Sequence, residues 1–213
     1  MKKAMLLTTE ANRDLCFGEE HIGALRKLVE LTDCCHLIGN LEALRPRLQQ
    51  TEIICSSWGL MRLDEEFLAA APRLKAVFYA AGSVRGFVTE AFWDRGILLT
   101  NGAAALAVSV AEFTVALITL ASKGAFDCNR ATRQSRTFAR VQPIKGMYQT
   151  RIGIIGVGQV GRRVIGLLRS YEVELFCYDP FLGPEQARQL GARPIPLEEM
   201  FRTCDVVTLH APN

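Results

Sequence analysis

A glycine-rich segment between an apolar run and an amphipathic stretch constrains the fold of this chain most. Gly156, Gly158 and Gly161 follow a four-residue apolar run, and residues 160–168 have the spacing of an amphipathic helix. Asp179 ends a second strand-like run, 18 residues after the last of these glycines. This order of strand, G-x-G-x-x-G turn, helix and acid-ended strand is the context that a dinucleotide-binding unit requires. The segment therefore predicts a parallel α/β sheet that binds a dinucleotide.

Each residue of the turn has a predicted role. Gly156 makes the tight turn, Gly158 lacks the Cβ that would block a pyrophosphate, and Gly161 lets the helix pack closely on the strand. The amides of Gln159 and Val160 open the helix, where unpaired N–H groups and the helix dipole attract an anion. These five residues form the predicted pyrophosphate site. The alternative is a nucleotide-free α/β unit whose glycines match the pattern by coincidence.

The end of the second strand-like run predicts which dinucleotide binds. Asp179 is expected to accept hydrogen bonds from the adenosine ribose hydroxyls. A 2′-phosphate would meet its carboxylate, and Pro180 and Phe181 supply no cation, so NAD is predicted rather than NADP. A further strand-like run over residues 206–210 is expected to end beside the turn, where ligands bind to such sheets. The residues expected to line the cofactor groove there are Thr208, His210 and Ala211.

Residues 1–101 are predicted to form a complete flavodoxin-like domain. Strand-like apolar runs occur at residues 4–8, 36–39, 52–55, 74–80 and 97–100. Helical spacing occurs at residues 21–31, 41–48, 64–71 and 89–95. Asp64 and Thr89 are the expected N-caps of the last two helices. Strands that alternate with helices imply a parallel sheet, and five strands complete the flavodoxin-like order 2-1-3-4-5.

Residues 102–213 are predicted to form a Rossmann domain that is incomplete at its C-terminal end. Its strands are expected at residues 152–156, 174–179, 193–195 and 206–210, which fill four of the six places in the order 3-2-1-4-5-6. Residues 104–123 are expected to form a helix that is apolar nearly all round. Such a helix must be buried between layers or subunits. Glu112 near its middle argues against a membrane span.

Charge gives little support for a nucleic-acid partner. The formal net charge is +3, although residues 123–163 carry nine basic residues and one acid. Arg130, Arg133 and Arg136 share one helical face in this run. A solvated linker helix beside an anion site is the favoured interpretation, because acids elsewhere compensate the charge.

Cysteine usage and the N-terminus predict a cytoplasmic protein. The seven cysteines are scattered without C-x-x-C spacing, which is typical of reduced thiols rather than of a disulfide framework. Cys34, Cys35 and His36 are adjacent, a spacing that suits zinc poorly, so no metal is predicted. The apolar run after Lys3 is too short for a signal peptide, and no membrane partner is expected.

Gly82, Ser83 and Val84 form a turn after the fourth strand-like run. Their backbone N–H groups could form an anion-binding nest, and a simple connecting turn is the equally weighted alternative.

These motifs together resemble the N-terminal part of a D-isomer-specific 2-hydroxyacid dehydrogenase, over nearly the whole chain. The matching segments are the Gly82-Ser83 loop, Asn101-Gly-Ala-Ala-Ala, Val110-Ala-Glu-Phe-Thr, the glycine fingerprint, Tyr178-Asp-Pro, Leu197-Glu-Glu-Met-Phe and Asp205-Val-Val-Thr-Leu-His-Ala-Pro.

The resemblance implies an NAD-dependent oxidoreductase. The enzyme would transfer a hydride between nicotinamide and a small D-2-hydroxy or 2-oxo acid. It implies that Gly82, Ser83 and Val84 offer amides to the substrate carboxylate, and that the helix from residue 104 lies near the interface of a homodimer. The residues that it assigns to NAD are Gly156, Gly158, Gln159, Val160, Gly161, Asp179, His210, Ala211 and Pro212.

Two departures from the family affect the expected activity. The family's catalytic Arg, acid and His belong to segments beyond residue 213, so no catalytic residue is assigned. The chain is therefore expected to be a fragment that does not turn over substrate and that binds NAD weakly. The Gly82-Ser-Val-Arg-Gly loop also differs from the family's usual turn, which leaves the substrate undetermined. The alternative function is a non-catalytic NAD-binding regulatory or interaction module of the same fold.

Overall fold

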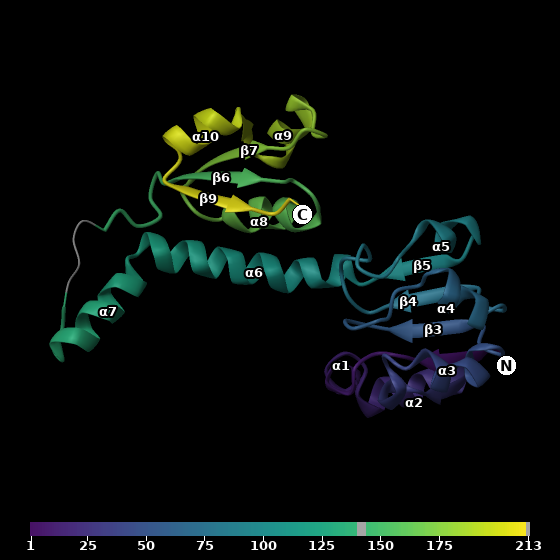
Figure 1. Ribbon diagram of the computed structural model, residues 1–213. Coiled ribbons are helices and arrows are strands. Elements are labelled where there is room, and N and C mark those ends of the chain that lie inside the picture. Colours follow the sequence, from purple (N-terminus) through teal and green to yellow (C-terminus); the bar gives the residue numbers. More distant parts are fainter. Residues whose placement is uncertain (140–143, 212–213) are drawn as a thin grey trace. The chain divides into compact units, whose positions relative to one another are not determined.

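The computed structural model describes residues 1–139 and 144–211 and divides the chain into two compact units, Met1–Ala104 and Ala105–Asn213 (Figure 1). The predicted division lay between residues 101 and 102. Each unit contains one parallel sheet and its own hydrophobic core.

The first unit has a five-stranded parallel sheet in the order β2-β1-β3-β4-β5, which confirms the predicted flavodoxin-like fold. Its strands are β1 (Lys3–Leu6), β2 (Glu30–Asp33), β3 (Ile53–Ser56), β4 (Ala76–Tyr79) and β5 (Leu98–Asn101). Its helices are α1 (Glu10–Cys16), α2 (Gly18–Leu28), α3 (Leu41–Leu48), α4 (Glu65–Ala70) and α5 (Glu90–Asp94), with a short 3₁₀ helix, η1, at Cys35–Leu37.

The two faces of this sheet are covered to different extents. On one face, alternate strand residues such as Ile54 and Val77 are buried with Leu44 of α3, Phe67 of α4 and Phe92 of α5. On the other face, Leu6 and Cys55 pack with Phe17 and Ile22 from the α1–α2 segment. Over β4 and β5 this second face is open, because Phe78 and Leu98 are 42% and 58% exposed.

Helix ends in the first unit follow local side-chain chemistry. The Asp64 carboxylate accepts from the Phe67 amide at 3.0 Å, and the Thr89 hydroxyl accepts from the Phe92 amide at 3.3 Å, which confirms both predicted N-caps.

The prediction of a strand at residues 36–39 was wrong. The second strand is β2, and the predicted residues lie in and after η1. β2 is an edge strand that carries only one apolar residue, Leu31, so it has no apolar run to find. Cys34 and Cys35, which directly follow β2, are buried in two of the core clusters.

The second unit has a four-stranded parallel sheet in the order β8-β7-β6-β9, which matches the first four places of the Rossmann order. Its strands are β6 (Arg151–Ile155), β7 (Glu174–Tyr178), β8 (Arg193–Pro194) and β9 (Val206–Leu209). Its helices are α6 (Ala103–Ser122, which begins at the division between the units), α7 (Ala125–Ser135), α8 (Gln159–Leu168), α9 (Pro184–Leu190) and α10 (Leu197–Thr203).

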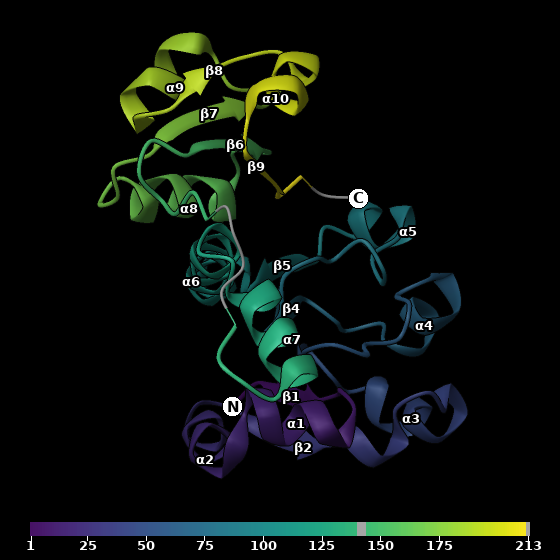
Figure 2. The same cartoon turned by 90° about the vertical axis from the view of Figure 1, so that its left-hand side faces the viewer.

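Helices cover both faces of the second sheet, with α8 and α10 on opposite sides (Figures 1 and 2). Ile152 and Ile154 of β6 pack with α8, whereas Gly153 of the same strand faces α10. A Cβ at Gly153 would lie 2.5 Å from the Met200 side chain, so the side chains of α10 pack directly on this strand.

Within the described chain, α6 is buried on one side, and its predicted burial between layers or subunits stays a prediction for the other side. Ala111, Val115 and Ile118 pack in the core of the second unit. Other apolar side chains of α6 are exposed, and these are Val108, Val110, Phe113, Leu117 and Leu120. By length and composition alone α6 could cross a membrane. Its buried face shows that it is a core helix of the second unit with one apolar side left uncovered.

Candidate cofactor and substrate sites

The fingerprint turn joins β6 to α8 and depends on glycine at Gly156. Its φ is +84°, a left-handed conformation that side chains rarely adopt. A Cβ there would lie 2.5 Å from the Ala211 nitrogen and 2.7 Å from the His210 carbonyl carbon. The turn therefore lies directly against the segment that follows β9, as the sequence predicted for the cofactor groove.

Gly161 brings α8 against this turn. A Cβ at Gly161 would lie 2.1 Å from the Gly156 carbonyl oxygen. The first turn of the helix is therefore fixed close to the end of β6, in the position predicted for the third glycine.

Gly158 lies at the opening of the site. It is the N-cap of α8 and its φ is −77°, and apart from its own chain neighbours no atom of the described residues lies within 4 Å of the position of its Cβ. No side chain caps this ten-residue helix. The amides of Gln159 and Val160 begin the helix and face open space at its uncapped N-terminus. Such a space has the shape and polarity that a pyrophosphate requires.

Asp179 directly follows β7, beside this turn, and accepts hydrogen bonds from two backbone amides. Its Oδ2 accepts from the Val157 N–H at 2.7 Å and its Oδ1 accepts from the Phe181 N–H at 2.8 Å. Each carboxylate oxygen keeps a lone pair for another donor, as ribose hydroxyls would be. The sequence pattern identified Asp179 but not its bond to Val157, since that contact depends on the register of β6 with β7.

His210 closes the other side of the turn. Its N–H donates to the Ile155 carbonyl at 2.7 Å, and its Nε2 lies 3.0 Å from Thr208 Oγ1. Burial lowers the pKa of His210 below its usual value of 6.5, so the ring is neutral at pH 7. Ala211 follows it against Gly156, and Pro212, which was predicted to continue the groove, lies outside the described residues.

The predicted carboxylate loop in the first unit is a short turn after β4. The Val84 carbonyl accepts from Phe87 and Val88 amides at 3.2 Å, which closes the turn. Ser83 is exposed, whereas Ala81 before it is fully buried. The loop thus begins at the buried carboxyl end of a strand and reaches the surface at Ser83.

Two buried hydroxyls at the carboxyl ends of β1 and β3 were not predicted. Thr8 and Ser57 follow β1 and β3, both are fully buried, and their side-chain oxygens lie 2.9 Å apart. The available signal was the hydroxyl residues that directly follow two apolar runs, in the segments Thr8-Thr9 and Ser56-Ser57.

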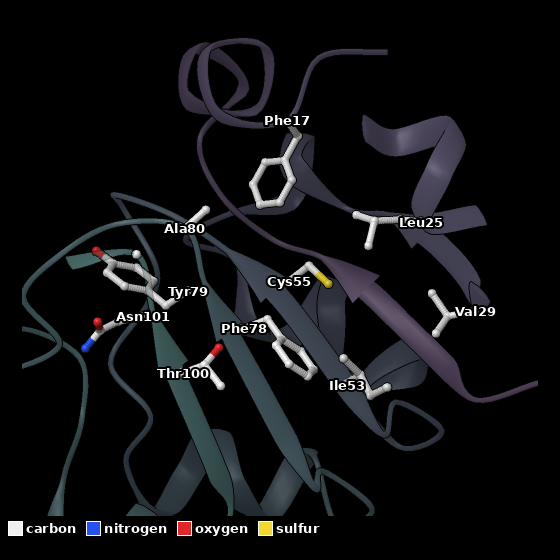
Figure 3. Close-up of a pocket in the computed structure, with 11 residues that line it drawn as sticks. Phe17, Leu25, Val29, Ile53, Cys55, Phe78, Tyr79, Ala80, Thr100 and Asn101 are labelled. Atoms are coloured by element: carbon white, nitrogen blue, oxygen red, sulfur yellow. The ribbon is translucent and has the colours of Figure 1, made fainter. Parts of the chain in front are cut away.

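An apolar groove lies on the open sheet face of the first unit, where Phe17 and Leu25 line it together with Ile53 and Phe78 (Figure 3). Few polar groups converge there, so it lacks the features of a site for a small acid. Within residues 1–139 and 144–211, no cluster of His, Cys, Asp or Glu could hold a metal ion.

The sequence matches one characterised family and its relatives. The family described as "D-isomer specific 2-hydroxyacid dehydrogenase, NAD binding domain" matches residues 115–213. D-3-phosphoglycerate dehydrogenase from Synechocystis is 28% identical over 153 residues, which are 71% of this chain and 27% of that protein. The human enzyme of the same name is 27% identical over 203 residues, with 88% of this chain and 38% of that protein covered.

A solved structure agrees with this match. D-lactate dehydrogenase from Aquifex aeolicus, complexed with NAD and lactic acid, is 25% identical with a TM-score of 0.72. The alignment covers 98% of this chain and 61% of that structure. The chain therefore spans less than two thirds of the proteins that it matches.

Proposed function

Because this chain belongs, through its NAD-binding unit, to the D-isomer-specific 2-hydroxyacid dehydrogenases, we propose that it serves NAD-dependent hydride transfer to or from a small D-2-hydroxy or 2-oxo acid. The observation that carries the proposal is the open, uncapped turn at Gly158, with Asp179 held by the Val157 amide behind it. NAD, when bound, supplies the hydride acceptor or donor.

The residues of the second unit have separate roles in holding NAD. The Gln159 and Val160 amides bind the pyrophosphate, and Asp179 accepts from the adenosine ribose. Neutral His210 and Ala211 form the wall of the groove. A neutral ring there adds no charge beside the cofactor.

The first unit would hold the substrate. The Gly82, Ser83 and Val84 amides bind its carboxylate, as an anion nest does. None of His21, His36 and His210 matches the family's catalytic histidine. We therefore expect the 213-residue chain to bind NAD without turning over pyruvate, glyoxylate or hydroxypyruvate.

We also propose that two copies of the chain pair through α6. Val110, Phe113, Leu117 and Leu120 are exposed at a three–four–three spacing, which places them in one stripe along the helix. A stripe of this kind is typical of a helix that packs on a partner helix in water. A cytoplasmic homodimer with no nucleic-acid or membrane partner is the form of the protein that we propose.

Calorimetric titration of the 213-residue chain with NAD and NADP tests the cofactor assignment. We expect NAD to bind more tightly than NADP, because Asp179 accepts from ribose hydroxyls and repels a 2′-phosphate. Asp179→Ala should weaken NAD binding about tenfold or more, which corresponds to about 1.4 kcal/mol. Asp94→Ala, at an exposed carboxylate on α5, is the control. Unchanged NAD affinity in the folded Asp179→Ala variant would contradict the assignment.

A further inference from the structure

Helix α8 begins without the negative charge that most other helices of this chain carry in their first turn. The first turns of α1, α2, α3, α4, α5, α7, α9 and α10 each contain at least one Asp or Glu. The first turn of α8 contains no acid, and no side chain caps the helix. Because the N-terminus of a helix is the positive end of its dipole, a negative charge there stabilises the helix. In α8 only a bound anion would supply that charge.

Two arginines lie close to this N-terminus. Arg162 and Arg163 are the fourth and fifth residues of α8, and both are exposed. Within the described part of the chain, neither of them forms an ion pair. Cations at this end of a helix are unfavourable for the helix dipole. Their presence therefore does not stabilise the free helix, whereas it would stabilise an anion bound in front of it.

Helical geometry brings Arg163 over the proposed pyrophosphate site. Arg163 follows Gln159 by four residues, so the two side chains are neighbours on one face of α8. Both residues are exposed, whereas Val164 and Leu168 on the other face are buried. Side chains on a helix lean toward its N-terminus, and a residue covers the turn that precedes it. The Arg163 guanidinium therefore comes within reach of an anion that the amides of Gln159 and Val160 bind.

The other side chains around the turn do not neutralise a pyrophosphate. Gln159 carries no charge, and His210 is neutral at pH 7. Asp179, which accepts from the Val157 amide, is itself negative. Backbone amides provide partial charges, whereas an arginine pairs with a phosphate through two parallel N–H···O bonds and a full positive charge. Arg163 would supply the charge that these neighbours do not.

We propose that Arg163 is a cofactor-binding residue whose guanidinium pairs with the pyrophosphate of NAD. This rests on the proposed function, which assigns the pyrophosphate to the amides of Gln159 and Val160. The amides fix where the phosphates lie, and Arg163 balances their charge from the solvent side. An ion pair at an exposed position is screened by salt, so NAD affinity should fall as the salt concentration rises.

Calorimetric titrations of the 213-residue chain with NAD and with adenosine test this role. Adenosine keeps the ribose that Asp179 is proposed to hold but has no phosphate. We expect Arg163→Gln to weaken NAD binding about tenfold at about 50 mM KCl and to leave adenosine binding unchanged. At about 0.5 M KCl the loss should shrink to about threefold, because salt already screens the pair in the native chain. Arg163→Lys, which keeps the charge, should retain part of the affinity and its salt dependence.

Matched variants separate this inference from a structural effect and from the proposed function. Arg169→Gln makes the same charge change at the far end of α8 and is the control, with melting temperatures to check each fold. NAD affinity in Arg163→Gln equal to that of the control would overturn the inference, as would a loss in Arg162→Gln alone. Equal losses for NAD and adenosine in Arg163→Gln would also overturn it, since only a structural change affects both ligands. If the native chain bound neither ligand, the cofactor part of the proposed function would fall, and this inference with it.

Discussion

At the scale of single residues, the three fingerprint glycines differ in what a Cβ would meet. At Gly156 and Gly161 it would enter backbone atoms of the chain itself, whereas at Gly158 it would enter open space. Gly156 and Gly161 are therefore needed to fold the turn, whereas Gly158 is needed only when a ligand approaches. The G-x-G-x-x-G pattern predicted all three positions, but it cannot distinguish these two kinds of requirement.

Alanine variants should separate folding from binding. Gly158→Ala should change the melting temperature little and weaken NAD binding about tenfold, since the added methyl group lies where the pyrophosphate approaches. Gly156→Ala should destabilise the chain by about 1–3 kcal/mol through its positive φ and backbone contact. Gly166→Ala, in an uncrowded position on α8, is the matched control. Thermal melts and calorimetry measure both effects; equal NAD affinity for Gly158→Ala and the native chain would be incompatible with the proposed pyrophosphate position.

At the scale of elements, ion pairs of one carboxylate, that of Glu52, link the amino ends of three neighbouring strands. Glu52 precedes β3 and pairs with Lys75, before β4, at 2.8 Å and with Lys2, before β1, at 3.2 Å. Hydrogen bonds from Lys75 and Lys2 lower the pKa of Glu52 from 4.5 to about 2. A carboxyl whose pKa is lowered by folding stabilises the fold above its unfolded pKa and loses this contribution on protonation.

The stability of the first unit should therefore depend on Glu52 in acid. As the pH falls from 4.5 to about 2, the native chain should lose melting temperature faster than Glu52→Gln does. Above pH 5 the native chain should be the more stable of the two. Melting curves by circular dichroism across this range measure the difference, with Glu20→Gln on α2 as the control. Parallel pH profiles for the native chain and Glu52→Gln would show that the cluster does not contribute.

Sequence patterns predicted elements well where the apolar period is strong. Helix α3 at Leu41–Leu48 has the predicted bounds. β2 was missed because an edge strand needs few apolar residues, and α1 was missed because none of its residues is buried. Within the candidate site, residue types and spacing could be predicted, whereas the Thr8–Ser57 and Val157–Asp179 contacts arise only when separate strands come into register.

At the scale of the whole molecule, α6 has two apolar sides with different roles. One side completes the core of the second unit, and the other presents the stripe of Val110, Phe113, Leu117 and Leu120. Contiguous exposed apolar side chains on a soluble protein mark an interaction surface. The stripe could not be distinguished from the buried side by sequence, because both are equally apolar.

Charges placed in the stripe should therefore separate the proposed dimer. The double variant Phe113→Asp, Leu117→Asp should weaken self-association about 30-fold or more, since buried anchors at an interface contribute about 2 kcal/mol or more. The double variant Asn129→Asp, Gln134→Asp, at two exposed amides of α7, is the charge-matched control. Sedimentation velocity over a concentration series measures the dimer. A native chain that stays monomeric throughout, or a double variant that dimerises as the native chain does, would contradict the proposal.

The open face over β4 and β5 affects how the stability of this chain can be measured. Fluorescent dyes that brighten on apolar surfaces are commonly used to report unfolding or loosely packed states. The groove lined by Phe17, Leu25 and Phe78 offers such a dye a place in the fully folded chain. A bright signal before heating should therefore be expected from the native protein. Melting points for the variants above are better taken from circular dichroism than from dye emission.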